Sequence, residues 1–403
     1  MKIKITYKEA IEILESQAVA TKGIERVFLH DSLGRILAQD IIAPSDMPQC
    51  ALSNMDGYAI SSKFIDEKNF KILQENPAGR LESLEIPLNA PYAIKTFTGA
   101  RIPLNADILV PIEFVKVGGE CLEILQLPKV GEFIRQKGAN YKKGEILLKK
   151  GTRINANHIG LLASLNCVFV EVYERAKVGI LVSGNELVEL GGDLKWGQVY
   201  NTNGHLLFAK IKEIGANPKL YGILKDDKEE IEKVLNLALS ECDLIITSGG
   251  ASVGDYDFIS ALCKERKSEV IFKGVQIKPG QHVIYAHFNN KQFFALPGFP
   301  NSTLVTFELF VKRILAKMQG FNWTPLALEL PLQESVKKSD NRLEFRVCNL
   351  RNINGKFSID FVDKKDFQSA ILNNFCPLDS AICALCILDG EKNSGELVQI
   401  LIL

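Results

Sequence analysis

Residues 176–187 read AKVGILVSGNEL, and they open a run of alternating strand and helix patterns that decides the fold. Apolar, β-prone stretches lie at residues 177–182, 219–224 and 243–247. Helical spacing of apolar residues occurs between and after them, at 205–214, 228–239 and 256–267. Strands that alternate with helices predict a parallel sheet covered on both faces, with ligands bound in the loops where the strands end.

A glycine-rich loop, TSGGASVGDYD at residues 247–257, lies between one of these strands and the helix expected after it. Gly249, Gly250 and Gly254 allow tight turns and a close approach of the backbone to a ligand, while Ser248 and Ser252 add hydroxyl donors. The loop therefore predicts a phosphate-binding site, with an ordinary glycine-rich turn as the alternative. A helix N-terminus contributes only about 0.3–1 kcal/mol to a nearby anion, whereas micromolar binding needs about 8 kcal/mol. Other loops must therefore contribute.

Two further loops follow predicted strands and carry turn residues that can also bind a ligand. They are SGNEL at residues 183–187 and LPGFPNS at 296–302, although either is also ordinary connection chemistry. Carboxylates recur at the same edge of the predicted sheet, namely Glu186, Asp226, Asp227, Asp255 and Asp257. We expect them to hold Mg²⁺ against phosphate oxygens, with helix capping as the alternative for Asp226, Asp227 and Asp255.

The remaining chain predicts three more domains. Thr6 and Glu9 form a capping box for a helix at 6–18, and helical spacing returns near residue 155, so residues 1–44 and 141–175 predict one linker domain. Short β-prone runs broken by Pro and Gly predict an inserted β-rich domain at 45–140. The α/β domain takes 176–322, and short β-like runs predict a C-terminal β domain at 323–403. The fold class is multidomain α/β plus β.

Composition narrows the functional classes. The 403 residues carry 48 Lys plus Arg and 48 Asp plus Glu, so no global field favours nucleic acid or an acidic membrane surface. We find no signal-like start and no apolar run of about 20 residues, and we expect a soluble, cytoplasmic protein. The nine cysteines then predict reduced, packed thiols. Cys376, Cys383 and Cys386 have metal-ligand spacing as the alternative, but their apolar surroundings favour a buried strand.

Eight ordered segments resemble the MoeA and gephyrin E-domain family, the molybdopterin molybdenumtransferases. They are SNMDGYAI (53–60), TGARIPLNADILVPIE (98–113), IRQKG (134–138), VGILVSGNEL (178–187), GQVYNTN (197–203), ITSGGASVGDYDF (246–258), IKPG (277–280) and LPGFP (296–300). The resemblance spans nearly the whole chain. It implies a linker domain, an inserted β domain, a molybdopterin-binding α/β domain and a C-terminal β-barrel. It also implies that molybdate displaces AMP from adenylyl-molybdopterin in a reaction that requires Mg²⁺.

The resemblance implies a homodimer in which the inserted domain of one subunit faces the α/β domain of the other. Asp56 and Thr98 would come from the partner, and the α/β domain would supply the other catalytic carboxylates, Glu186, Asp226 and Asp257, which are also the expected Mg²⁺ ligands. The expected molybdopterin-binding residues are Ser183, Gly184, Ser248, Gly249, Gly250, Ser252, Gly254, Lys278, Pro297 and Pro300. Molybdopterin adenylyltransferase and apo-molybdoenzymes are the partners expected besides a second copy.

Four positions depart from the family pattern: Asn140, Gln281, His282 and Phe299. A lost cation at Gln281 is expected to weaken anion binding, and a lost carboxylate at Asn140 to weaken the placing of metal or molybdate. These changes leave a catalytically weakened paralogue as an alternative. A nucleotide pyrophosphatase of the competence-damage type is a second alternative, which does not need the Asp56 and Thr98 segments. A scaffold, as gephyrin is, is the third.

Overall fold

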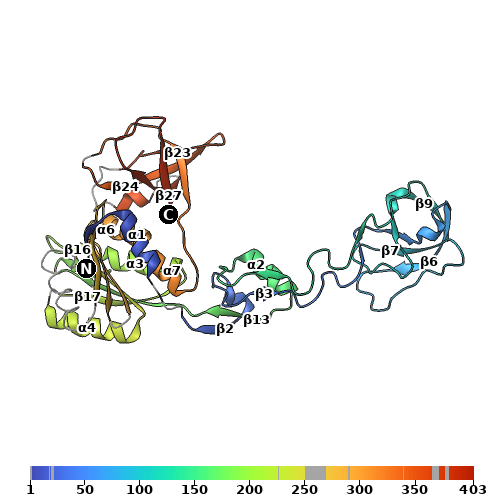
Figure 1. The fold of residues 1–403 in the computed structure, drawn as a ribbon, viewed down its shortest axis with the longest axis horizontal. Helices are drawn as coiled ribbons and strands as arrows, with labels where there is room; N and C mark the ends of the chain where they lie inside the picture. Colours follow the sequence, from blue (N-terminus) through green and yellow to red (C-terminus); the bar gives the residue numbers. More distant parts are fainter. Residues whose placement is uncertain are drawn as a thin grey trace. The chain divides into compact units, whose positions relative to one another are not determined.

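The structure is a computed structural model that describes residues 2–17, 19, 22–225, 227–249, 269–288, 291–338, 340–364, 372–376 and 381–403. Its chain divides into two compact units. The larger unit comprises the residues up to Ala38 together with 151–160 and 168–403, and the smaller comprises 39–150 and 161–167. The smaller unit therefore interrupts the sequence of the larger one (Figure 1), and the four-domain division expected from the sequence stays a prediction.

A seven-stranded sheet forms the centre of the larger unit. Its order is β1 (Lys2–Ile5), β19 (Glu269–Val275), β21 (Ile284–Phe288), β22 (Lys291–Leu296), β18 (Leu244–Ser248), β14 (Lys177–Ser183) and β17 (Asn217–Leu224). The four strands from β22 to β17 are parallel, but β21 runs antiparallel to both of its neighbours. The sheet is thus mixed, which corrects the purely parallel sheet expected. Two residues separate β21 from β22, which suffices for a hairpin but not for a crossover.

Helices cover both faces of this sheet, as the alternating pattern predicted. The side chains of β14 alternate between two apolar clusters, with Ile180 in one and Leu181 in the other. Helix α3 (Thr202–Glu213) packs Leu207 into the first cluster, and α4 (Lys228–Glu241) packs Leu235 into the second. The helix expected at 256–267 lies outside the described residues.

Helix α1 (Tyr7–Ser16) and three consecutive helical segments after β22 also belong to the larger unit. Helix α1 starts at the predicted capping box, in which the Thr6 N–H donates to Glu9 Oε2 at 2.8 Å. After β22 the chain continues through α6 (Pro300–Thr306), the π-helical turn η4 (Phe307–Val311) and α7 (Lys312–Met318). None of the described helices is long and apolar enough to cross a membrane.

The C-terminal part forms a second sheet, which has six strands. Its strands are β20 (Ile277–Lys278), β24 (Leu343–Ile353), β26 (Ile382–Leu388), β27 (Leu397–Ile402) and β23 (Ala327–Pro331), with β25 (Lys356–Asp360) also paired to β24. An isolated bridge joins Leu332 to Ile359, beside the outer strands, and the closed barrel stays a prediction. Cys386 is fully buried in this sheet, and burial raises the pKa of its thiol to about 12. Both observations agree with a packed, reduced thiol. The eight described cysteines form no disulfide.

The smaller unit contains a six-stranded β-sheet. Its order is β8 (Ile108–Pro111), β5 (Gly57–Ile60), β7 (Tyr92–Thr96), β6 (Asn69–Asn76), β10 (Cys121–Ile124) and β9 (Val115–Gly118). Two short ladders accompany it, β4 (Leu52–Ser53) with β11 (Ile134–Arg135) and β3 (Ile41–Ile42) with β12 (Ile146–Leu148). The β-rich character predicted for this region is therefore confirmed.

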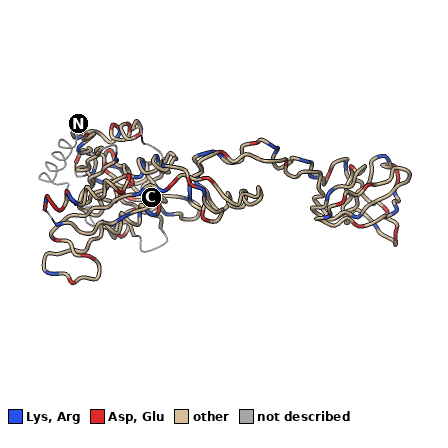
Figure 2. Tube along the Cα trace, turned by 90° about the horizontal axis from the view of Figure 1, so that it is seen from below, with Lys and Arg blue, Asp and Glu red and all other residues tan. Residues whose placement is uncertain are grey.

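The remaining elements are short. Strands β2 (Ile24–Phe28) and β13 (Phe169–Tyr173) pair with each other, as do β15 (Leu187–Val188) and β16 (Val199–Tyr200). Helix α2 spans Ala156–Ser164, and the 3₁₀ turns are η1 (Leu29–Ser32), η2 (Ser62–Phe64), η3 (Ile112–Phe114) and η5 (Leu372–Phe375). Figure 2 shows Lys and Arg interspersed with Asp and Glu along both units, in keeping with the net charge of zero. Any anionic ligand must therefore be bound by local groups.

Candidate functional site

Three loops at the carboxyl ends of the neighbouring parallel strands β14, β18 and β22 line one cavity of about 980 Å³. Their contributions include Glu186, Ser248 and Pro300. The N-terminal turn of α3 adds Asn201 and Asn203. These are the three loops, at 183–187, 247–257 and 296–302, whose sequences predicted ligand binding. The volume suits a ligand of nucleotide or pterin size.

Gly249 brings two of these loops into contact. Its φ of +83° lies in the left-handed region, and a Cβ at this position would lie 2.3 Å from the Ser183 carbonyl oxygen. A side chain therefore cannot be accommodated without moving the backbone after β14 or after β18. This explains why position 249 of the predicted phosphate loop is a glycine. Gly250, Ser252 and Gly254, the rest of that loop, lie outside the described residues.

Glu186 is the one acidic side chain that the described residues contribute to this cavity. It is exposed, and its carbonyl oxygen accepts from the Val199 N–H at 2.9 Å, so the β15–β16 ladder fixes its backbone. The Glu186 carboxylate reaches back over Gly184, where a Cβ would lie 2.8 Å from Oε2. One carboxylate together with ligand phosphate oxygens is a donor set that Mg²⁺ accepts. Asp226, Asp255 and Asp257 lie outside the described residues.

Asp227 serves as a helix cap rather than as a cavity group. Its side chain accepts a hydrogen bond from the Glu230 N–H at 2.8 Å, at the start of α4. The carboxylate is thereby committed to the backbone donors that a helix leaves unsatisfied at its N-terminus. Of the carboxylates offered as Mg²⁺ ligands or caps, Asp227 is thus confirmed as a cap.

Asn201 and Asn203 belong to the family-like segment at 197–203 but were not predicted as site residues, and both line the cavity. The Asn201 side chain caps α3 by accepting from the Gly204 N–H at 3.0 Å, and it donates to Glu189 at 3.1 Å. Asn203 Nδ2 donates to Ser248 Oγ at 2.9 Å and to the Gly298 carbonyl oxygen at 2.7 Å. The capping role of Asn201 could have been predicted, because asparagine is a common residue before a helix. The contacts of Asn203 with Ser248 and Gly298 could not, because only the fold brings these residues together.

A smaller cavity of about 240 Å³ lies beside the first and shares Phe299 with it. Lys278 and Pro297 line the smaller cavity, whereas Pro300 lines the larger one. The residues expected to bind molybdopterin are therefore divided between two neighbouring spaces. Arg342 also lines the smaller cavity, and the sequence motifs did not include it. Two cationic side chains in so small a space favour an inorganic anion.

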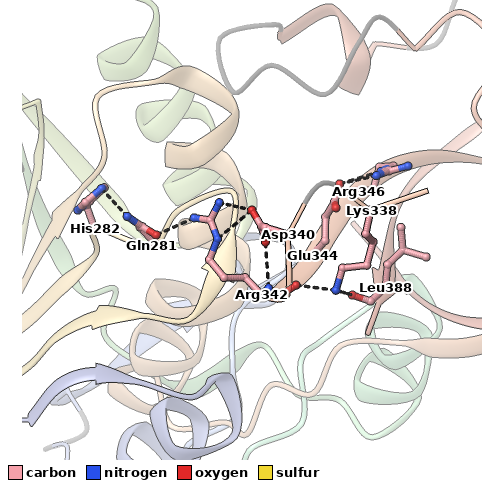
Figure 3. A network of polar contacts seen from close by, with 8 residues as sticks. All are labelled: Gln281, His282, Lys338, Asp340, Arg342, Glu344, Arg346 and Leu388. Carbon is pink, nitrogen blue, oxygen red and sulfur yellow. Dashed lines mark hydrogen bonds and ion pairs between the residues drawn. The ribbon is translucent and has the colours of Figure 1, made fainter. Parts of the chain in front are cut away.

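A chain of polar contacts holds Arg342 in place (Figure 3). The Arg342 guanidinium donates to Asp340, and Arg342 Nη1 donates to Gln281 Oε1 at 2.6 Å. Gln281 Nε2 in turn donates to His282 Nε2 at 2.9 Å. Burial, followed by the Arg342 charge, lowers the pKa of His282. Two of the four departures from the family pattern therefore extend the contacts of Arg342, and His282 is mostly neutral at neutral pH.

The Asp340–Arg342 pair makes stability depend on pH. Hydrogen bonds from the Arg342 side chain hold the pKa of Asp340 at about 2, below its ordinary value. Because the pKa is depressed on folding, the pair stabilises the protein above pH about 4 and loses this contribution as pH falls towards 2. We expect the unfolding free energy of Asp340→Asn to depend less on pH over this window than that of the wild type. Denaturant unfolding at several pH values measures it, and equal slopes would contradict the assignment.

The smaller unit brings Asp56 and Thr98 together. The Thr98 N–H and Oγ1 both donate to Asp56 Oδ1, at 2.7 and 2.8 Å. These two hydrogen bonds lower the pKa of Asp56, so the exposed carboxylate is ionised at neutral pH. Asn140, where the resemblance implies an acid, is exposed, and its N–H donates to the Met47 carbonyl oxygen at 2.8 Å. Asp56 and Thr98 thus form a preorganised anionic turn.

Parallel strands that end at a common cavity, with a glycine that excludes any side chain, define an α/β protein with a site for a small ligand. Family comparison then makes the assignment specific. The MoeA N-terminal region (domain I and II) matches residues 5–166, and the probable molybdopterin binding domain matches 179–317. The chain belongs to the MoeA family, the molybdopterin molybdenumtransferases.

Relatives match over nearly the full chain. The molybdopterin molybdenumtransferase of Haemophilus influenzae is 35% identical, over 93% of this chain and 93% of its own length. That of a Nostoc species is 33% identical, over 94% and 88%. The crystal structure of the molybdopterin biosynthesis moeA protein from Pyrococcus horikoshii is 29% identical, with a TM-score of 0.84 over 99% of this chain and 100% of that one.

Proposed function

We propose that this protein inserts molybdate into adenylyl-molybdopterin and releases AMP, as an enzyme of molybdenum cofactor biosynthesis in the cytoplasm. The observation that carries the proposal is the cavity at the ends of β14, β18 and β22, in a chain that matches molybdenumtransferases over nearly its full length. The larger cavity has the volume for the adenylylated pterin.

Each described group in the larger cavity has a role in this reaction. Ser248 and the backbone beside Gly249 face the phosphates, where fixed donors stabilise the charge that develops when the anhydride breaks. Glu186 would hold Mg²⁺ against the phosphate oxygens. Bound there, Mg²⁺ neutralises the negative charge that otherwise repels an incoming oxyanion. The sequence also assigns Asp226 and Asp257 to the proposed Mg²⁺ site and Ser252 to the phosphate loop, and all three lie outside the described residues.

The smaller cavity is the proposed place for the oxyanion. Lys278 and Arg342 supply positive charge there, and the shared residue Phe299 places this cavity next to the proposed pterin site. An oxyanion bound in a fixed position beside the reacting sulfur atoms gains rate from proximity. The Arg342 contact to Gln281 supports the proposal, because it holds the arginine beside position 281, where the resemblance implies a lysine.

The active form is proposed to be a homodimer with composite sites. Asp56 and Thr98 of one subunit would complete the cavity of the other, and the ionised Asp56 carboxylate is suited to orient a hydrated Mg²⁺. The substrate would come from a molybdopterin adenylyltransferase, and apo-molybdoenzymes would take up the product.

AMP release tests the proposal directly. With adenylyl-molybdopterin and Mg²⁺, we expect the purified protein to release AMP only when molybdate is added. Glu186→Gln should lower this rate by at least about 100-fold, since a removed electrostatic group typically costs about 2.7 kcal/mol or more of the barrier. Glu229→Gln, a surface change in the first turn of α4, is the control and should leave the rate unchanged.

The same assay separates the alternatives. AMP release without molybdate would instead support a nucleotide pyrophosphatase, and no release at all would support a weakened paralogue or a scaffold. The match at residues 5–166 favours the transferase, because a pyrophosphatase would not need the Asp56 and Thr98 segments that this region contains.

A further inference from the structure

Asn203 joins three elements around the larger cavity. It is the second residue of α3 and is only 8% exposed. Its amide nitrogen donates one hydrogen bond to Ser248 Oγ at 2.9 Å, at the end of β18. It donates a second to the Gly298 carbonyl oxygen at 2.7 Å, after β22. Both donor hydrogens are thus used inside the protein. Asn203 therefore has no hydrogen left to donate to a ligand.

The orientation of this amide is fixed by chemistry. A backbone carbonyl oxygen only accepts hydrogen bonds, so the group 2.7 Å from Gly298 must be the amide nitrogen and not Oδ1. Asn203 Oδ1 is consequently buried and finds no partner among the described residues. A buried acceptor without a partner costs free energy. The two hydrogen bonds that the amide nitrogen donates offset this cost.

The contact also decides what the Ser248 hydroxyl does. Because the amide nitrogen only donates, Ser248 Oγ must accept, and its own proton must be directed elsewhere. No acceptor for that proton lies among the described residues. Ser248 is fully buried and lines the larger cavity. An ionised phosphate oxygen of a bound ligand is a strong acceptor at such a place.

We infer that Asn203 is a positioning residue, which makes Ser248 an obligate donor to a phosphate oxygen of the ligand and fixes the spacing of the loops after β18 and β22. The inference rests on the proposed function, because it takes the phosphate-bearing ligand to occupy the larger cavity. Asn203 acts only through Ser248 and Gly298, and touches no reacting atom itself.

Binding of adenylyl-molybdopterin to the purified protein, well below the lowest unfolding temperature, tests this inference. Asn203→Ala should weaken affinity by about 10-fold, the value of a hydrogen bond to a charged group. Asn203→Asp should weaken it further, because the carboxylate captures the Ser248 proton and repels the phosphate. In a Ser248→Ala background, Asn203→Ala should add little, since residues that act as a unit are not additive.

Asn349 provides a matched control. It is 2% exposed, its Nδ2 donates to Asp360 Oδ1 at 2.9 Å and to the Val362 carbonyl oxygen at 3.0 Å, and its Oδ1 also has no partner in the described ranges. It lies in the C-terminal sheet and does not line the cavity. Asn349→Ala should lower the melting temperature as Asn203→Ala does, but leave the affinity unchanged.

The outcomes separate the inference from the proposed function. If the wild type does not bind adenylyl-molybdopterin, the proposed function fails, and the inference fails with it. If the wild type binds and the Asn203 variants bind equally well, only the inference is overturned. It is likewise overturned if Asn203→Ala and Ser248→Ala weaken binding additively, or if Asn349→Ala weakens binding as much as Asn203→Ala does.

Discussion

Gly249→Ala is expected to lower the unfolding free energy by about 2–5 kcal/mol and to remove ligand binding. The left-handed backbone of Gly249 costs an alanine about 1–2 kcal/mol. The new Cβ would also lie 2.3 Å from the Ser183 carbonyl oxygen, and such overpacking costs about 1–3 kcal/mol more. Because the backbone must move to relieve the clash, the loops after β14 and β18 can no longer present their groups to one ligand.

Gly355→Ala is the matched control for this variant. Gly355 also has a left-handed backbone, with φ of +81°, but a Cβ there meets nothing within 4 Å. It should therefore cost only the backbone term of about 1–2 kcal/mol and leave affinity for adenylyl-molybdopterin unchanged. Denaturant unfolding and ligand titration measure both effects. If Gly249→Ala behaved like Gly355→Ala in both measurements, the close approach of the two loops would not matter for binding.

Local patterns predicted the elements well, because periodicity and capping depend on neighbouring residues alone. The strand at 177–182 is β14, the helix at 228–239 is α4, and the Thr6 capping box is present. Strand direction, in contrast, could not be predicted from the local pattern. The apolar run of β21 reads the same whether it pairs parallel or antiparallel, and its direction follows from the two residues before β22.

The site was predictable only in part, because motifs report turns and ligands but not distant partners. Glu186, Ser248, Gly249 and Pro300 do meet at one cavity. However, Pro297 and Pro300 belong to one short motif and line different cavities, since the chain turns into α6 between them. Asn203 and Arg342 contribute through residues that are 45 and 61 positions away in sequence, which no local pattern reports.

The departure from the family pattern at Gln281 likewise takes its meaning from a partner that is distant in sequence, Arg342. A lysine at position 281 would place a third cation beside Lys278 and Arg342, whereas glutamine accepts a hydrogen bond from Arg342 Nη1 at 2.6 Å. The change therefore removes one mobile charge and adds a hydrogen bond that holds Arg342 in place. Arg342 also donates to Asp340, so part of its charge is neutralised locally. The net expectation is weaker but more directional anion binding in the smaller cavity.

Mixing two inactive variants is expected to restore activity if the site is shared between subunits. Asp56→Asn and Glu186→Gln should each abolish molybdate-dependent AMP release when present in both subunits. Asp56→Asn removes the charge that accepts both hydrogen bonds from Thr98, and Glu186→Gln removes the carboxylate that lines the larger cavity. In a mixed dimer one site keeps both groups, while the other site loses both.

Random reassembly of equal amounts makes half of the dimers mixed, so about one quarter of the wild-type activity should return. Asp46→Asn is the control, because Asp46 is a carboxylate of the smaller unit that likewise accepts a backbone N–H, from Lys143 at 2.8 Å. It should be active alone and in any mixture. If Asp56 and Glu186 served the same site within one subunit, every subunit in the mixture would carry a broken site and no activity would return. Full activity of Asp56→Asn alone would show instead that the Asp56–Thr98 turn takes no part in the reaction.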